Sequence, residues 1–492
     1  MTKKFIVAFF ISLGAASFLI IEDVAAQDSI SVDWNKIIAV SKTTATLQVV
    51  ENPMVRPSSP IHKSTFEALK NLGAGYVRYV PWFPYPKMAV AELKPPTKTE
   101  TFWDFTYLDS TMEALMNATE GHSVVINFST TPEWLWKTDG AVKFPDDPYQ
   151  VAWDYRDGTT LKDTTMKELA GYYARLFSWY TKGGFTDELG RFHQSNHHYK
   201  ISYWEVLNEP DLEHNIPVEM YTKMYDAIVA ALKKISPTTR FIGISLAFNA
   251  RPEYFEYFLN HKNHQPGIPL DGISYHFYGT RSYHNQPLEE YQYSFFDKAN
   301  AFLEKVRFIE SIRKRLSPQT ITTINEIGTI IGSSTGDDIP GTYWNVSGAM
   351  YAYLYLELTK MGIEVAGESQ LVGYPSQYPD VSMMDWKNGK PNSRYWILKL
   401  IKDNFGPGDK LVATSAHGDF ICQAFNTATG KKILFINPRN KEKKINLPGD
   451  MKDASVHYVD ERTGEEPVAH EPLTEPSITL RPFEVAVVDL KP

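Results

Sequence analysis

Residues 203–211 read YWEVLNEPD, an apolar run that ends in an amide, a carboxylate and a proline. The run has the composition of a buried strand, and proline cannot continue the backbone hydrogen bonding of such a strand. In a barrel of alternating strands and helices, catalytic side chains gather where the parallel strands end. These residues therefore predict a catalytic strand end, although a charged loop after a core strand would also fit this stretch alone.

A second strand of the same kind occupies residues 320–328, which read TITTINEIG. Its β-branched residues again end in Asn-Glu, and a glycine closes the run. Two strand-and-helix units lie between the two stretches, so Glu209 and Glu326 are expected at the same end of one barrel. Two strand-terminal glutamates are a sharper signal for chemistry than either one alone.

Strand patterns alternate with helical patterns throughout residues 45–405. The predicted strands are 45–49, 75–82, 122–129, 199–209, 241–247, 271–278, 320–328 and 363–372. This alternation predicts an α/β fold, a (β/α)8 TIM barrel. Glycine and proline at 406–408 mark a boundary, and the short alternating runs of residues 406–492 predict an accessory antiparallel β-sandwich domain. The N-terminal segment, residues 27–44, could add an edge strand to that domain.

The composition is that of a globular protein with an acidic balance. The 492 residues are 43% hydrophobic and 22% charged, and the formal net charge of −8 offers no basic surface for nucleic acid. Aromatic residues make up 13% of the chain and would provide flat apolar surfaces for a ligand. A large barrel also buries many aromatic side chains, and burial accounts for most of them.

Residues 1–26 have the features of a secretory signal peptide. Lysines precede an uncharged run over residues 5–21, and small residues before Gln27 allow cleavage there. The run is short for a membrane span and no basic cluster follows it, so a membrane anchor is the less favoured alternative. The single cysteine, Cys422, allows no intrachain disulfide. A secreted or periplasmic protein without a membrane span is therefore expected.

The residues around both glutamates resemble glycoside hydrolase clan A. The run from Trp204 to Leu212 reads WEVLNEPDL and is most similar to family 39, which includes β-xylosidases and α-L-iduronidases. The resemblance implies that Glu209 is the general acid and base, with a raised pKa, and that Glu326 is the nucleophile. It also implies retention, for which the carboxyl groups lie roughly 5 to 5.5 Å apart, whereas a distance of about 7 to 9 Å indicates inversion.

The same resemblance assigns binding roles to residues at other strand ends. Asn208 would hydrogen-bond the sugar 2-hydroxyl, and because neighbouring strand residues face opposite ways, the strand is expected to break its pleat there. Arg78 would hold the nucleophile, although a buried pair with Glu205 is the alternative for an arginine in this apolar strand. His276 and Tyr278 would contact the nucleophile and the substrate, although a single histidine at a strand end is usually structural.

Two tryptophans follow the third predicted strand and are candidate sugar platforms. Trp134 and Trp136 lie just past its C-terminal end, where active-site side chains gather, but either could instead pack into the top of the barrel. The long segment that follows, residues 139–164, is expected to wall the pocket.

No metal site and no cofactor are predicted. Between His193 and the adjacent pair His197 and His198 lie three residues that favour a loop, and no cysteine or aspartate cluster joins the histidines. Glu368, in the last predicted strand, is a reserve nucleophile should Glu326 point away from the pocket.

Two positions depart from the family pattern. Ile327 follows the expected nucleophile where an aromatic residue or threonine is more usual, and Leu207 stands where tryptophan is common. Because of these two changes, the sequence does not indicate that this protein shares the substrates of xylosidases or iduronidases. We expect an exported, retaining glycoside hydrolase that is exo-acting on an oligosaccharide or polysaccharide. The alternatives are an endo-acting glycanase of the same clan and a carbohydrate-binding protein that kept the barrel without the reaction.

Overall fold

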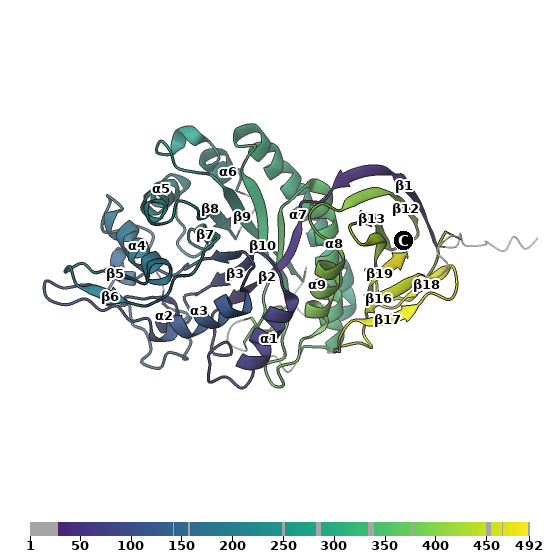
Figure 1. The fold of residues 1–492 in the computed structure, drawn as a ribbon, viewed down its shortest axis with the longest axis horizontal. Coiled ribbons are helices and arrows are strands. Elements are labelled where there is room, and N and C mark those ends of the chain that lie inside the picture. The colour runs from purple at the N-terminus through teal and green to yellow at the C-terminus, as the bar shows by residue number, and fades with distance from the viewer. Residues whose placement is uncertain are drawn as a thin grey trace, which may run out of the picture.

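The computed structural model describes residues 28–140, 142–155, 158–247, 251–281, 287–332, 339–374, 378–448, 454–464 and 466–490. The predicted signal peptide, residues 1–26, lies outside these described residues. Within them, none of the helices combines the length and the apolar character that crossing a bilayer requires. The molecule is elongated, with a barrel at one end and a smaller β domain at the other (Figure 1).

Eight parallel strands close into a barrel, and helices surround it (Figure 1). The strands are β2 (Thr44–Val50), β3 (Val77–Val80), β4 (Val124–Ile126), β7 (Tyr203–Glu205), β8 (Arg240–Leu246), β9 (Gly272–Thr280), β10 (Ile321–Ile330) and β11 (Val365–Glu368). The helices are α1 (His62–Leu72), α2 (Pro86–Ala89), α3 (Thr106–Ala118), α4 (Lys167–Lys182), α5 (Val218–Ile235), α6 (Pro252–Phe258), α7 (Leu288–Leu316), α8 (Gly341–Met361) and α9 (Ser393–Asn404). A small hairpin, β5 (Gly184–Thr186) and β6 (Phe192–Gln194), follows α4. The predicted (β/α)8 fold is confirmed.

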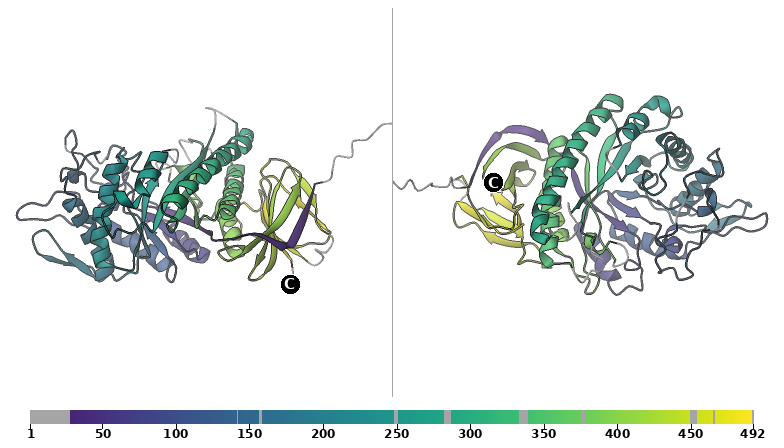
Figure 2. Two further views of the ribbon diagram at one scale, coloured as in Figure 1. Left: turned by 90° about the horizontal axis from the view of Figure 1, so that it is seen from above. Right: turned by 180° about the vertical axis from the view of Figure 1, so that it is seen from behind.

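A nine-stranded, mostly antiparallel sheet forms the second part of the chain and lies beside α8 and α9 (Figures 1 and 2). In spatial order its strands are β17 (Ala469–Pro472), β16 (Ser455–Val459), β19 (Val485–Leu490), β14 (Gly430–Ile436), β13 (Ile421–Thr427), β12 (Lys410–His417), β1 (Ser29–Val40), β15 (Lys443–Asn446) and β18 (Ser477–Leu480). The sheet curls over an apolar core of its own, which includes Val412, Ile433 and Val488. The accessory antiparallel β domain of the predicted fold class is therefore present.

Strand β1 occupies a different place from the one expected for residues 27–44. The sequence predicts an edge strand, but β1 lies between β12 and β15. It pairs antiparallel with β12 along most of its length and meets β15 through one parallel pair, Ser29 with Asn446. The physical reason is that the sheet curls, which brings β15 to the side of β1 that would otherwise present unpaired backbone groups.

Helix α5 packs against the barrel and holds the ends of two neighbouring strands, β7 and β8, together. Tyr221, Ile228 and Leu232 recur at helical spacing and are fully buried. The hydroxyl of Tyr221 donates to the carbonyl of Val206 at 2.9 Å and accepts from the amide of Ile244 at 2.7 Å. One side chain of α5 therefore ties the end of β7 to β8, beside the residues that form the site.

Candidate active site

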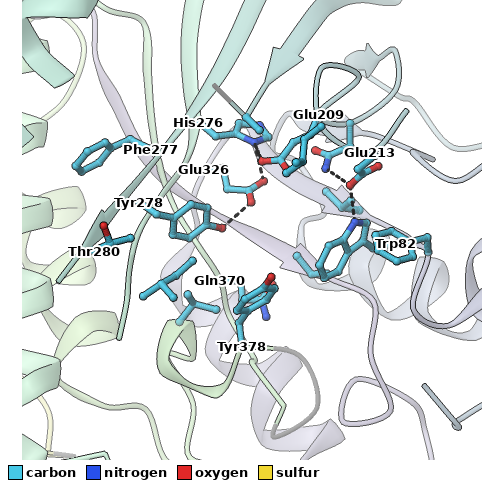
Figure 3. A pocket seen from close by; sticks show the side chains of 18 of the residues that line it. Trp82, Glu209, Glu213, His276, Phe277, Tyr278, Thr280, Glu326, Gln370 and Tyr378 are labelled. Carbon is cyan, nitrogen blue, oxygen red and sulfur yellow. Dashed lines mark hydrogen bonds and ion pairs between the residues drawn. The ribbon is translucent and has the colours of Figure 1, made fainter. Parts of the chain in front are cut away.

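A cavity of about 940 Å³ opens where the barrel strands end (Figure 3). This volume is in the range of small-molecule sites. Five of the predicted side chains line it: Asn208 and Glu209 after β7, His276 and Tyr278 on β9, and Glu326 on β10. Parallel strands bring their carboxyl ends to one edge of the barrel, so residues far apart in sequence meet there.

The chain after β7 departs from strand geometry, so two consecutive side chains, Asn208 and Glu209, face the cavity. Leu207 and Glu209 have left-handed backbone angles, with φ of 60° and 39°. The amide of Glu209 donates to the carbonyl of Ser245 at 2.9 Å, which holds the distorted segment in place. The predicted break in the pleat at Asn208 is confirmed, and strained backbone of this kind is typical of functional sites.

Strand β10 has a second irregularity at the other glutamate. Its pairing with β9 shifts register between Thr323 and Glu326, and its pairing with β11 shifts in the same region. Asn325 therefore turns into the barrel, where its amide donates to Glu205 at 2.8 Å, while the next residue, Glu326, reaches the cavity. An irregularity in a strand re-aims the side chains beside it in this way.

Glu209 and Glu326 lie close together across the cavity. One carboxylate oxygen of each and a ring nitrogen of His276 all lie within 4.8 Å of one another. His276 Nδ1 is 2.8 Å from Glu209 Oε1 and 3.4 Å from Glu326 Oε2. The imidazole of His276 therefore lies between the two carboxylates and contacts both (Figure 3).

Arg78 holds the Glu326 carboxylate from inside the barrel. Its Nη1 is 2.8 Å from Glu326 Oε2, and its Nε is 2.5 Å from Glu205 Oε2. Both interpretations of Arg78 therefore apply at once, because the guanidinium pairs with Glu205 and also holds Glu326. Its other hydrogen bonds go to Gln48 Oε1 at 2.6 Å, Asn208 Oδ1 at 2.6 Å and Ser245 Oγ at 3.1 Å.

Tyr278 holds the other oxygen of Glu326. Its hydroxyl donates to Glu326 Oε1 at 2.6 Å and lies 2.7 Å from the hydroxyl of Ser369. Burial raises the pKa of Tyr278 well above its ordinary value, and the charge of Glu326 adds to this shift, so the phenol keeps its proton. Donors therefore orient both oxygens of Glu326.

Glu209 has the electrostatics of a proton donor. Burial raises the pKa of Glu209 and outweighs the opposing hydrogen bond and charge of His276, while the charges of Glu326 and Asp211 raise it further. Burial lowers the pKa of His276, but the adjacent carboxylates of Glu326 and Glu209 outweigh burial and raise it. The Glu209–His276 pair therefore retains a proton that can be transferred to a bound substrate.

The segment that carries both glutamates matches a known enzyme family. Residues 190–328 match the family model of glycosyl hydrolases family 39. The chain is therefore a glycosidase, and over these residues it is similar to family 39. The predicted resemblance is confirmed, and the family model covers the stretch from the hairpin of β5 and β6 to Gly328 on β10. A comparison with curated protein sequences found no match.

Solved structures of glycosidases share the fold of this glycoside hydrolase. A family 39 β-xylosidase from Caulobacter crescentus is 14% identical, with a TM-score of 0.60 and coverage of 94% of this chain and 100% of that one. An α-L-arabinofuranosidase from Thermotoga maritima is 14% identical, with a TM-score of 0.62 and coverage of 95% and 100%. A family 30 endoxylanase from Clostridium papyrosolvens is 14% identical, with a TM-score of 0.56 and coverage of 94% and 100%.

The two predicted tryptophans do not line the cavity of this glycosidase. Trp136 is 0% exposed and stacks on His214, with ring centroids 4.8 Å apart. Trp134 is partly buried, and its indole donates to the carbonyl of Glu92 at 2.9 Å. The prediction of sugar platforms was therefore wrong, because the chain forms a 3-10 turn at Glu133–Leu135 that directs both indoles into packing.

Trp82, Trp153 and Tyr378 form an aromatic wall of the cavity instead. The rings of Trp82 and Tyr378 stack with centroids 6.2 Å apart, and Trp153 packs edge-on against both. Trp82 ends the second predicted strand, so its strand-end position is a sequence signal like that of the predicted residues. Trp153 lies in residues 139–164, and the expectation that this segment walls the pocket is confirmed. No sequence signal points to Tyr378.

The reserve nucleophile and the histidine cluster lie elsewhere in the glycosidase. Glu368 is fully buried and pairs with Arg394 at 2.8 Å instead of lining the cavity. His193 lies 2.9 Å from Asp187 at the β5–β6 hairpin, also away from the cavity. Glu368 and His193 therefore have structural partners of their own.

One group among the described residues has the spacing of a metal site, and it is the group of Glu209, His276 and Glu326. The Arg78 guanidinium already lies 2.8 Å from Glu326. A cation bound by these three residues would therefore meet a permanent positive charge inside the barrel.

Replacing Arg78 with methionine is expected to destabilise the glycosidase by about 3–5 kcal/mol, because it leaves the buried Glu205 carboxylate without its charge partner. Despite burial, the charge of Arg78 and the bond from Ser274 lower the pKa of Glu205. The pair therefore stabilises the fold above the unfolded pKa of about 4.3, and this contribution is lost as pH falls through the folded pKa. Urea unfolding of both proteins at several pH values measures the difference.

The double variant Arg78→Met, Glu205→Gln is the control for this prediction. It removes the unpaired charge and should recover part of the lost stability. A loss below about 1 kcal/mol in the single variant at neutral pH would show that the pair contributes no more than a surface ion pair.

Proposed function

We propose that this glycosidase is exported, acts by retaining double displacement and releases a terminal sugar from a saccharide. The observation that carries the proposal is the approach of the Glu209 and Glu326 carboxylate oxygens to within 4.8 Å in one cavity. Inverting pairs lie roughly 6.5–9.5 Å apart, because a water molecule must fit beside the sugar, whereas retaining pairs lie about 5–5.5 Å apart.

The two glutamates divide the work between them. In the first step the Glu326 carboxylate forms a bond to the anomeric carbon, the glycosidic bond breaks, and Glu209 gives its proton to the leaving oxygen. In the second step a water molecule attacks the anomeric carbon and gives a proton to Glu209, and the ester bond to Glu326 breaks. The raised pKa of Glu209 suits the acid, and the donors Arg78 and Tyr278 suit an oriented nucleophile.

Exo action is supported by the aromatic wall. Trp82, Trp153 and Tyr378 pack against one another at the cavity, which favours a pocket for one terminal sugar over an open groove for a polymer. Export is supported by residues 1–26, whose lysines, apolar run and small residues have the order of a signal peptide.

A panel of nitrophenyl glycosides tests the reaction, with pentosides first because two of the structural neighbours are a β-xylosidase and an α-L-arabinofuranosidase. Proton NMR of the first sugar released should show the anomer of the substrate. Release of the opposite anomer would rule out retention. Internal cleavage of a soluble polysaccharide without terminal sugar release would indicate an endo-acting glycanase, and binding without release would indicate a carbohydrate-binding protein.

Activity is expected to fall on the alkaline side as Glu209 loses its proton. The first step needs Glu209 protonated, so kcat/KM should decrease as pH rises through the raised pKa of the Glu209–His276 pair. Rates measured across pH should lose this alkaline limb in Glu209→Gln. A dinitrophenyl glycoside is the control, because its leaving group departs without a proton. An unchanged alkaline limb in the variant would contradict the assignment of the acid.

A further inference from the structure

Glu213 is a third carboxylate at the cavity, and the two catalytic steps do not use it. Its Oε1 accepts a hydrogen bond from the indole N–H of Trp82 at 2.6 Å (Figure 3). The same oxygen accepts a hydrogen bond from the side-chain amide of Asn208 at 2.8 Å. We propose that Glu213 is a positioning residue that aims the Asn208 amide at the sugar 2-hydroxyl and anchors the indole of Trp82. This inference rests on the proposed function.

Charged groups hold the Asn208 amide at both ends. Its Oδ1 accepts from Arg78 Nη2 at 2.6 Å, and its Nδ2 donates to Glu213 Oε1 at 2.8 Å. A flipped amide would turn its N–H groups toward the guanidinium and its oxygen toward the carboxylate, and both contacts would be repulsive. The amide therefore has one favourable orientation, set jointly by Arg78 and Glu213.

This orientation leaves a donor at the cavity. The Asn208 Nδ2 atom carries two N–H bonds, and Glu213 accepts one of them. In the described part of the chain, Nδ2 makes no further hydrogen bond. The second N–H is therefore placed for a sugar hydroxyl before the substrate arrives, and pre-oriented donors lower the cost of reaching the transition state.

The contact also explains why Glu213 acts through Asn208 and not through the nucleophile. Arg78 keeps Glu205, Gln48 and Glu326 as partners whatever happens at Glu213. Asn208, by contrast, has Glu213 as its partner on the amide nitrogen. Loss of Glu213 should therefore free the amide of Asn208 while Glu326 stays held.

The test compares Glu213→Ala with wild type on two substrates: the nitrophenyl glycoside that wild type cleaves fastest and its 2-deoxy analogue. If Glu213 acts through the 2-hydroxyl contact, the ratio of kcat/KM on the parent glycoside to kcat/KM on the 2-deoxy analogue should fall about 10-fold in Glu213→Ala. This is about the effect of losing one hydrogen bond that involves a charged group. Glu213→Gln keeps an accepting oxygen and should restore the ratio to within about 3-fold of wild type.

Trp82→Phe is the matched control, because it removes the indole N–H and leaves the Asn208 contact in place. Trp82→Phe should lower kcat/KM by the same factor on both substrates and leave the ratio of the two values unchanged. An unchanged ratio in Glu213→Ala would overturn the inference, since a merely structural loss affects both substrates alike. If Glu326→Gln still abolishes cleavage in that case, the proposed function stands and Glu213 alone is misassigned. If the wild-type protein cleaves no glycoside, both the proposed function and the role of Glu213 are wrong.

Discussion

Glu326→Gln should lower kcat on the order of 10⁴-fold or more on every glycoside that the enzyme cleaves, because the neutral amide cannot form the covalent intermediate. The loss should be the same for good and poor leaving groups, since both need the nucleophile. The fold should survive the substitution, because Arg78 keeps Glu205 as its partner at 2.5 Å. Initial rates on the nitrophenyl panel, with thermal unfolding of both proteins, measure the effect.

Glu364→Gln is the matched control for Glu326→Gln. Glu364 precedes β11 at the opposite end of the barrel and accepts from the amide of Thr322 at 3.0 Å, on the same strand as Glu326. The activity of Glu364→Gln should stay within about twofold of that of the wild-type protein. Azide added to Glu326→Ala should attack the anomeric carbon from the vacated side and give the glycosyl azide of inverted configuration. Activity retained in Glu326→Gln would show that Glu326 is not the nucleophile.

Glu209→Gln is expected to show a loss that depends on the leaving group. With a poor leaving group the first step lacks its acid, and the rate should fall by roughly 10²–10⁴-fold, the usual contribution of a general acid. With a dinitrophenyl leaving group the first step stays fast, and the second step, which lacks its base, becomes limiting. A burst of dinitrophenol followed by slow turnover, recorded by stopped flow, is the expected signature.

Azide distinguishes the role of Glu209 from that of Glu326. In Glu209→Ala, azide should attack the glycosyl ester of Glu326 from the vacated side and give the glycosyl azide with the configuration of the substrate. An equal rate loss for good and poor leaving groups, without a burst, would mean that Glu209 is not the acid.

Much of the barrel could be predicted from the sequence because its signals are local. Each of the eight predicted strands overlaps a barrel strand, since apolar runs bounded by turns and helices define parallel strands without reference to neighbours. The same pattern placed Asn208, Glu209, His276, Tyr278 and Glu326 at one end of the barrel, because parallel strands all finish at the same face.

The side-chain directions at that face could not be predicted in the same way. Trp82 ends one predicted strand, and Trp134 and Trp136 follow another, yet only Trp82 lines the cavity. The direction of each indole depends on the path of the chain after the strand, and long-range contacts decide that path. Trp82 is held by Glu213, from a loop 131 positions away, and Trp134 by the backbone of Glu92.

The amino-acid sequence by itself determined the order of strands and helices, the break in the pleat at Asn208 and the presence of two glutamates at one end of the barrel. Only the tertiary structure decided that Arg78 serves Glu205 and Glu326 together, that His276 contacts both carboxylates, and that β1 lies inside its sheet. The physical reason is the distance along the chain over which each kind of interaction acts. Periodicity and turn residues act within a few positions, whereas ion pairs and sheet neighbours form between segments that meet after the chain has folded.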